Sequence, residues 1–177
     1  MLDDRQRRKF EAEIMPLMSE AYNLARWLVK NDHDAEDVVQ EAYLRAFRFF
    51  AGRRTDNARS WLLRIVRNTS YDLTNRRKNN SVDANLDSVA STLTDPDQPD
   101  PAKALQKQSE QAMVREAIAA LAPEHREVIV LRELQDMSYR EIAEVVGVPI
   151  GTVMSRLSRA REHLATLLLS KRAEGDV

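Results

Sequence analysis

Residues 138–156 read SYREIAEVVGVPIGTVMSR, and this stretch predicts two helices joined by a tight turn. Ser138 and Glu141 form an S-x-x-E capping box, which marks the start of a helix. Gly147 tolerates the positive φ with which a helix commonly ends. Pro149 suits the start of the next helix, because its missing N–H costs nothing there.

The spacing within this stretch matches a helix-turn-helix. The first helix needs a small residue where the second crosses it, the turn needs a residue tolerant of positive φ, and the second helix needs an apolar residue directed back at the first. Ala143, Gly147 and Val153 meet these needs in that order. The candidates for contacts with base edges and phosphates in a major groove are Thr152, Ser155, Arg156, Arg159 and Arg161. No acidic residue lies between Val145 and Arg161, which favours DNA binding over the alternative of an ordinary helical hairpin.

Charge is distributed unevenly along the 177 residues. The net charge is −1, but residues 45–78 carry ten basic and two acidic side chains, for a local charge of +8. Residues 79–101 carry five aspartates and no basic residue. A phosphate backbone requires a local basic surface rather than a basic average. The block 45–78 is therefore a second candidate nucleic-acid surface, with a solvated helix face as the alternative.

Residues 81–101 interrupt the helical pattern. They contain five aspartates, and three prolines fall within six residues, which stops helices. We predict a flexible acidic linker here, between an N-terminal domain of residues 1–80 and a C-terminal domain of residues 102–177. Apolar residues recur at helical spacing on both sides and no strand is indicated. The expected fold is all-α, with two small helical domains.

The same periodicity predicts individual helices on each side of the linker. In the N-terminal part we expect one helix over residues 14–29, a second with Asp34 as its N-cap, and a third over residues 58–75. In the C-terminal part we expect a helix over residues 105–121 and another opened by Pro123.

Several classes of function are disfavoured by what the sequence lacks. It has no cysteine, and its three histidines show no ligand spacing, so we expect no metal and no cofactor. It has no phosphate-binding glycine-rich loop and no Ser-His-Asp arrangement, so we expect neither an enzyme nor a small-molecule substrate. No apolar run approaches the roughly 18 residues of a membrane span, which predicts a cytoplasmic protein without direct membrane insertion.

Motifs in both halves resemble those of the extracytoplasmic-function (ECF, group 4) sigma-70 family of RNA polymerase sigma factors. Residues 121–128, 138–143 and 151–156, the last reading GTVMSR, resemble sigma region 4. Residues 34–47 resemble region 2.2, and residues 61–68 resemble regions 2.3 and 2.4. The two groups of motifs stand in the order of that family and cover most of the chain.

The resemblance implies a subunit that binds core RNA polymerase and directs promoter-specific transcription initiation. Region 2.2 would contact the clamp helices of the largest polymerase subunit through Asp37, Gln40, Glu41 and Arg45. Asp37 could instead serve only as a partner of the helix dipole. Region 4 would read the −35 element through the five residues named above, and part of its surface would meet the polymerase flap.

Regions 2.3 and 2.4 would melt and read the −10 element of promoter DNA. The residues that the resemblance assigns to this task are Arg53, Arg54, Asn57, Trp61, Arg64, Arg67, Asn68, Arg76, Arg77 and Lys78. A melted strand is held by basic grooves and by surfaces on which bases stack. Trp61 could be such a surface, but its helical spacing with Ile65 makes a role in the core an equal alternative.

The resemblance also implies an anti-sigma factor as partner, because members of the family are usually held inactive by one. The alternative is a stand-alone helix-turn-helix regulator of transcription, which would need only the second half of the chain and would leave the basic first half unexplained. The two hypotheses differ in whether the isolated protein binds promoter DNA tightly or requires core polymerase.

Overall fold

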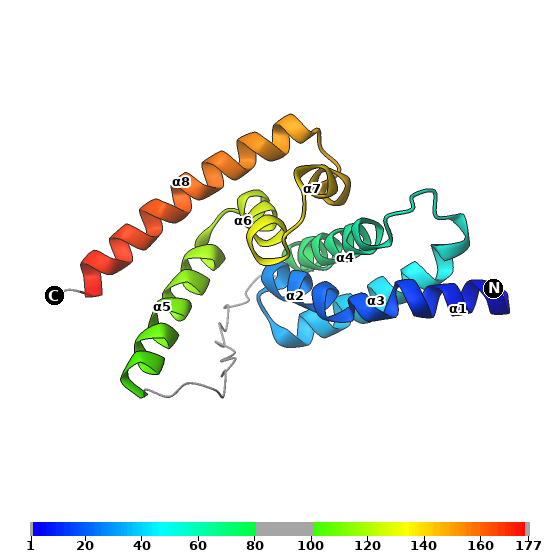
Figure 1. Ribbon diagram of the computed structural model, residues 1–177, viewed down its shortest axis with the longest axis horizontal. Coiled ribbons are helices and arrows are strands. Elements are labelled where there is room, and N and C mark those ends of the chain that lie inside the picture. The colour runs from blue at the N-terminus through cyan, green and yellow to red at the C-terminus, as the bar shows by residue number, and fades with distance from the viewer. Residues whose placement is uncertain (1, 81–100, 176–177) are drawn as a thin grey trace.

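The computed structural model describes residues 2–80 and 101–175, and within these ranges all regular structure is helical (Figure 1). This agrees with the all-α prediction. Within the same ranges, no helix combines the length and the apolar character needed to span a bilayer.

The N-terminal half is a bundle built around three long helices. Its elements are α1 (Asp4–Glu13), the 3₁₀ turn η1 (Met15–Leu17), α2 (Met18–Val29), α3 (Asp32–Phe49), the 3₁₀ turn η2 (Phe50–Gly52) and α4 (Ala58–Asn80). Helices α2, α3 and α4 pack against one another in all three pairs. Leu24, Val38 and Leu62 are essentially inaccessible to solvent and form the centre of this bundle.

Two expectations for this half were wrong. The helix expected over residues 14–29 is interrupted at Pro16, which lies in η1, because proline cannot donate the backbone hydrogen bond of a helix interior. The N-cap of α3 is Asn31, whose side chain accepts a hydrogen bond from the backbone N–H of Asp34 at 3.1 Å. Asp34 is instead buried in the first turn, where its carboxylate pairs with Arg77.

The C-terminal half is a smaller helical module. Its elements are α5 (Pro101–Ala120), α6 (Pro123–Ile129), the π-helical turn η3 (Val130–Leu134), α7 (Tyr139–Val146) and α8 (Ile150–Gly175). The start of α6 at Pro123 is confirmed, as are both hydrogen bonds of the Ser138–Glu141 capping box, at 3.2 and 2.8 Å. Gly147 is also confirmed in the left-handed conformation, at φ +77°.

The two halves pack against each other. Helix α4 lies against α7, and α2 lies against α6 and η3, so that buried residues of both halves form one hydrophobic cluster. In Figure 1, α6 and α7 lie between the N-terminal bundle and α8, which runs along the outer edge of the C-terminal half. We call the contact between the halves the seam. It brings α4, the core of the basic block, against the C-terminal half.

Candidate nucleic-acid interface

Helices α7 and α8 form the predicted helix-turn-helix. The turn is closed by the carbonyl of Ala143, which accepts hydrogen bonds from the N–H groups of Gly147 at 2.8 Å and Val148 at 3.3 Å. Val153, the residue expected to point back at the first helix, is fully buried. The opposite face of α8 carries Ser155 and Arg159, both exposed to solvent. These two side chains remain among the predicted contacts to DNA, and both are accessible in the described structure.

The other predicted −35 residues have contacts within the C-terminal half. Thr152 is partly buried at the start of α8. Arg156 lies 3.5 Å from the carboxylate of Glu127 on α6, and Arg161 forms an ion pair of 2.8 Å with Glu133 in η3. The hydrogen bonds that Arg161 donates to the carboxylate of Glu133 raise the pKa of Arg161. Within the predicted −35 set, Arg156 and Arg161 are thus paired with acidic side chains, whereas Ser155 and Arg159 are exposed.

The predicted −10 residues also divide into several groups. Six are exposed on α4 or in the loop before it: Arg54, Arg64, Asn68, Arg76, Arg77 and Lys78. Arg53 is different, because only 7% of its side chain is accessible and it pairs with Glu13 at 2.6 Å. Its guanidinium lies over the rings of Phe50 and Trp61, at 5.1 and 5.8 Å from their centroids. Trp61 is itself half-buried and packs on the core of the bundle.

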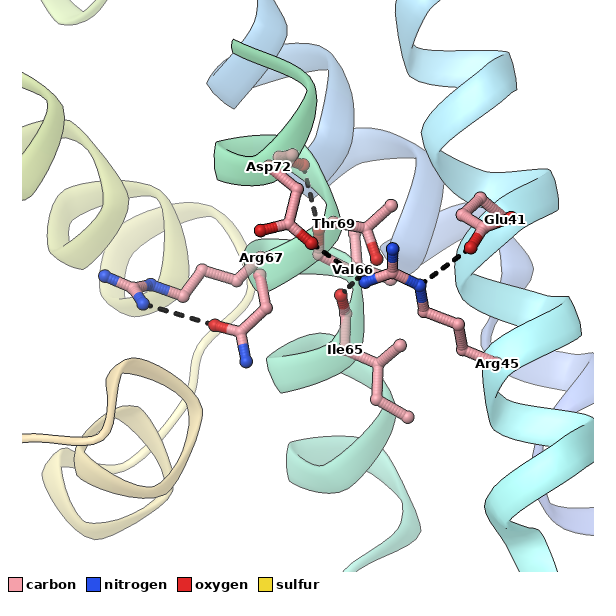
Figure 2. Close-up of polar contacts among 9 residues, drawn as sticks. Glu41, Arg45, Ile65, Val66, Arg67, Thr69 and Asp72 are labelled. Carbon is pink, nitrogen blue, oxygen red and sulfur yellow. Dashed lines mark hydrogen bonds and ion pairs between the residues drawn. The ribbon is translucent and has the colours of Figure 1, made fainter. Parts of the chain in front are cut away.

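Asn57 and Arg67 point from the basic block into the seam. Arg67 donates two hydrogen bonds to the carboxylate of Glu127, at 2.8 and 3.2 Å, and the Asn57 amide donates one to Glu141 at 3.2 Å. Figure 2 shows Arg67 on the side of α4 that faces away from α3. Of the residues predicted to read the −10 element, these two hold the C-terminal half in place.

Glu127 is the residue that the sequence gave no reason to single out. It is fully buried, and besides Arg67 and Arg156 it accepts a hydrogen bond from the hydroxyl of Tyr71 at 3.1 Å. Burial, followed by the negative charge of Glu127, raises the pKa of Tyr71 to about 12. Burial by itself would lower the pKa of Arg67, but the hydrogen bonds to Glu127, the negative charge of Glu127 and the interactions with Tyr71 together raise it.

Two further contacts cross the seam. The guanidinium of Arg59 pairs with Glu20 and donates to the carbonyl of Gln135, the residue that follows η3. The side-chain amide of Gln135 donates to the carbonyl of Glu20 at 3.0 Å. Nothing in the local pattern around Arg59 or Gln135 indicates these contacts, because the partners are more than 70 positions apart.

The residues predicted to bind core polymerase lie together on α3. Asp37, Gln40 and Glu41 are exposed on one face of the helix, and Arg45 joins Glu41 at 2.8 Å to Asp72 of α4 at 3.0 Å (Figure 2). The next turn of this face adds two apolar side chains that the sequence analysis did not select, Leu44 and Phe47, which are 62% and 37% exposed. Exposed apolar and aromatic side chains beside charged ones are typical of a protein–protein interface.

Comparison with known proteins places this arrangement in a family. Residues 14–80 match the family model for Sigma-70 region 2, and residues 111–164 match that for Sigma-70, region 4. The chain is 33% identical over 156 residues to the ECF RNA polymerase sigma factor SigE of Mycolicibacterium smegmatis, covering 86% of this chain and 59% of that protein. It is 37% identical over 149 residues to the ECF RNA polymerase sigma-E factor of Haemophilus influenzae, covering 80% of this chain and 77% of that protein.

The chain belongs to the ECF RNA polymerase sigma factors. Among solved structures, this sigma factor is similar to RpoE of Bartonella quintana, crystallised in complex with the anti-sigma factor NepR. The TM-score is 0.75 at 27% sequence identity, and the match covers 91% of this chain and 97% of that one. The relatives of this sigma factor are thus regulatory rather than catalytic proteins.

Proposed function

We propose that this sigma factor binds core RNA polymerase and directs it to specific promoters, with α8 reading the −35 element. The observation that carries the proposal is the exposed, acid-free face of α8 held by the turn at Gly147. Ser155 and Arg159 stand on that face with no other element covering them in the described structure. A helix presented in this way enters the major groove, where arginine reads guanine and serine reads several bases.

The −10 element is the proposed target of α4 and the loop before it. The exposed members of the basic block support this role, because a melted strand is held by cationic side chains along its backbone. The paired members, Arg53, Asn57, Arg67 and Arg77, would join them only after leaving the contacts described above. Residues 1–80 and 102–177 would act as the two DNA-reading domains, and most of the proposed linker between them lies outside the described residues.

Core polymerase is the proposed partner of α3. The exposed face that contains Asp37, Gln40 and Glu41 would dock on the clamp helices of the largest subunit, with Leu44 and Phe47 adding apolar area. The C-terminal half would meet the flap. Catalysis would belong entirely to the polymerase, so that this chain is not an enzyme and acts in the cytoplasm, where transcription takes place.

An anti-sigma factor is the proposed inhibitor. The similarity to a sigma factor crystallised with an anti-sigma factor supports this, since the match extends over nearly the whole of both chains. Recovery of an inhibitor together with polymerase subunits, after affinity purification of the native protein, is the expected result.

The test of the −35 assignment is transcription by reconstituted holoenzyme. Arg159→Ala should reduce transcription from a cognate promoter roughly tenfold, because it removes one arginine contact to DNA. Arg172→Ala removes the same charge from the same helix more than three turns farther on and serves as the matched control. Both variants should bind core polymerase as the wild type does. Equal transcription by the two variants would contradict the assignment of α8.

The stand-alone regulator is tested by omitting the polymerase. If the isolated protein bound promoter DNA as tightly as the holoenzyme does, the regulator hypothesis would be favoured. We expect weak binding by the isolated protein, with an affinity that falls as salt is added, because phosphate contacts release counterions.

A further inference from the structure

One carboxylate at the seam neutralises arginines from both predicted DNA-reading helices. Glu127 of α6 binds Arg67 of α4 at 2.8 and 3.2 Å and lies 3.5 Å from Arg156 of α8. No part of the Glu127 side chain is accessible to solvent, whereas the two arginine side chains are 22% and 28% accessible. Arg67 is a proposed −10 contact and Arg156 a proposed −35 contact.

Burial makes this carboxylate dependent on its partners. A buried charge is tolerated only when it is paired and hydrogen-bonded, and removal of one partner is strongly unfavourable. Two of the three partners, Arg67 and Tyr71, belong to the other half of the molecule. Glu127 therefore stabilises the packed arrangement of the two halves much more than it could stabilise the C-terminal half alone.

The surroundings of Glu127 cover the same face of α4. Asn57, another proposed −10 contact, is held by Glu141 of α7 at 3.2 Å. The guanidinium of Arg64 lies 3.7 Å from the position that a Cβ atom on Gly147 would occupy. The turn of the helix-turn-helix is therefore next to the basic block. A DNA strand following α4 would have to enter the space that α6 and α7 occupy.

We propose that Glu127 is a positioning residue that latches the two halves together and keeps Arg67 and Arg156 from DNA until the halves separate. The proposal rests on the proposed function and adds a control to it. In the form with packed halves, Glu127 binds the same guanidinium groups that promoter DNA would bind. A partner that favours separation of the halves, above all core polymerase, therefore shifts the population toward the form that binds promoters.

Separation of the halves can be measured without DNA or polymerase. The chain has no cysteine, so Ser19→Cys on α2 and Ala165→Cys on α8 introduce two unique labelling sites at exposed positions. Resonance energy transfer between dyes at these sites should fall in Glu127→Gln and equally in Arg67→Gln. Arg48→Gln removes the same charge from an exposed position on α3, away from the seam, and should leave the transfer unchanged.

Arg67→Gln also protects the test against misfolding. Glu127→Gln changes a fully buried residue and could destabilise the C-terminal half, whereas Arg67 lies at the edge of the other half and its removal breaks the same contact. Circular dichroism should report unchanged helix content in Arg67→Gln. Unchanged energy transfer in both variants would overturn the latch, even if holoenzyme transcription followed the proposed function.

DNA binding by the isolated chain gives the second readout. Glu127→Gln should bind a double-stranded promoter fragment roughly tenfold more tightly than the wild type, because it frees two arginines that each made a charged hydrogen bond or ion pair. A purely structural role for Glu127 would weaken DNA binding instead, and that outcome would overturn the proposal. Failure of wild-type holoenzyme to recognise any promoter would refute the proposed function, whereas the energy-transfer result would still decide whether the latch exists.

Discussion

Helices α4 and α8 carry similar basic patterns in the sequence, but their surroundings in the fold differ. On α8, Ser155 and Arg159 are open to solvent, and the paired members of the −35 set have their partners within the same half of the molecule. On α4 and the loop before it, Asn57 and Arg67 are engaged by the C-terminal half. A local charge count therefore shows where the cationic side chains are, whereas their availability for DNA depends on partners far away in the sequence.

The two helices also differ in what positions them. The face of α8 is oriented by nearby residues: the capping box at Ser138, the left-handed turn at Gly147 and the buried Val153. The face of α4 is set by packing against α2, α3 and α7 together. Local substitutions should therefore affect α8 selectively, whereas the state of α4 should depend on the seam.

The largest expected effect comes from truncating a buried side chain of α8. Leu157 is 1% exposed, so Leu157→Ala should lower the free energy of unfolding by about 2–5 kcal/mol, through lost burial and a residual cavity. Leu62→Ala, at an equally buried position of α4, is the matched variant in the other half. Chemical denaturation followed by circular dichroism should show one transition shifted by both variants, because the seam joins the two cores. Two transitions, each shifted by only one variant, would show that the halves unfold independently.

The next effect tests the turn that aims α8. Gly147→Ala should cost about 1–2 kcal/mol, because a side chain disfavours the left-handed conformation that this residue adopts at φ +77°. Gly147→Asn should cost less, since asparagine adopts that conformation more readily. Thermal unfolding of the two variants provides the measurement. An equal loss in both would contradict backbone strain as the cause, because a Cβ atom at Gly147 would lie at an ordinary contact distance of 3.7 Å from Arg64.

A smaller effect is expected at the start of α7. Ser138→Ala removes one hydrogen bond of the capping box and should lower the free energy of unfolding by about 1 kcal/mol.

Hydrogen bonding from the backbone of Ser138, and from Asn57, lowers the pKa of Glu141. A lowered folded-state pKa gives stability that is present above the unfolded pKa of about 4.3 and is lost as the pH falls through the folded value. Unfolding measured from pH 6 to about pH 3 should show this loss, and Glu141→Ala should not.

The smallest effect near neutral pH concerns the seam itself. The pKa of Tyr71 is raised to about 12, so the phenol is neutral in both folded and unfolded chains below about pH 10. As the pH rises from about 10 to 12, the unfolded state loses the proton first and stability falls. Tyr71→Phe should lack this part of the alkaline loss. An identical alkaline profile for wild type and Tyr71→Phe would argue against the contact between Tyr71 and Glu127.

Features encoded by neighbouring residues were predictable from the sequence. The capping box, the glycine turn, the proline at the start of α6 and the burial of Val153 all follow from spacings of a few residues, and all are confirmed. Periodicity was less precise about which apolar side chains face the core. Phe49 continues the helical spacing of the buried Ala42 and Ala46 on α3, yet it is 59% exposed, whereas the adjacent Phe50 is buried in η2.

The contacts of the candidate site were not predictable in the same way. Arg67 looks like any other arginine of the basic block, and only the approach of α6 gives it Glu127, 60 positions away, as a partner. Arg53 is withdrawn from solvent by Glu13, 40 positions earlier. Long-range ion pairs leave no periodic trace, so the sequence indicates a cationic surface without showing which of its members are occupied.

The π-helical turn η3 sets the rotation at which the C-terminal half packs against the N-terminal bundle. A π turn accommodates one more residue than an α-helical turn, and each residue advances a helix by about 100°. Here the N–H of Gln135 reaches back to the carbonyl of Val130 at 3.1 Å, and the side chain of Gln135 is thereby turned toward α2. Deleting a single residue between 130 and 134 would restore ordinary α-helical register and swing Gln135 away from Glu20 and Arg59. The extra residue thus sets the angular register at which the C-terminal half meets the bundle.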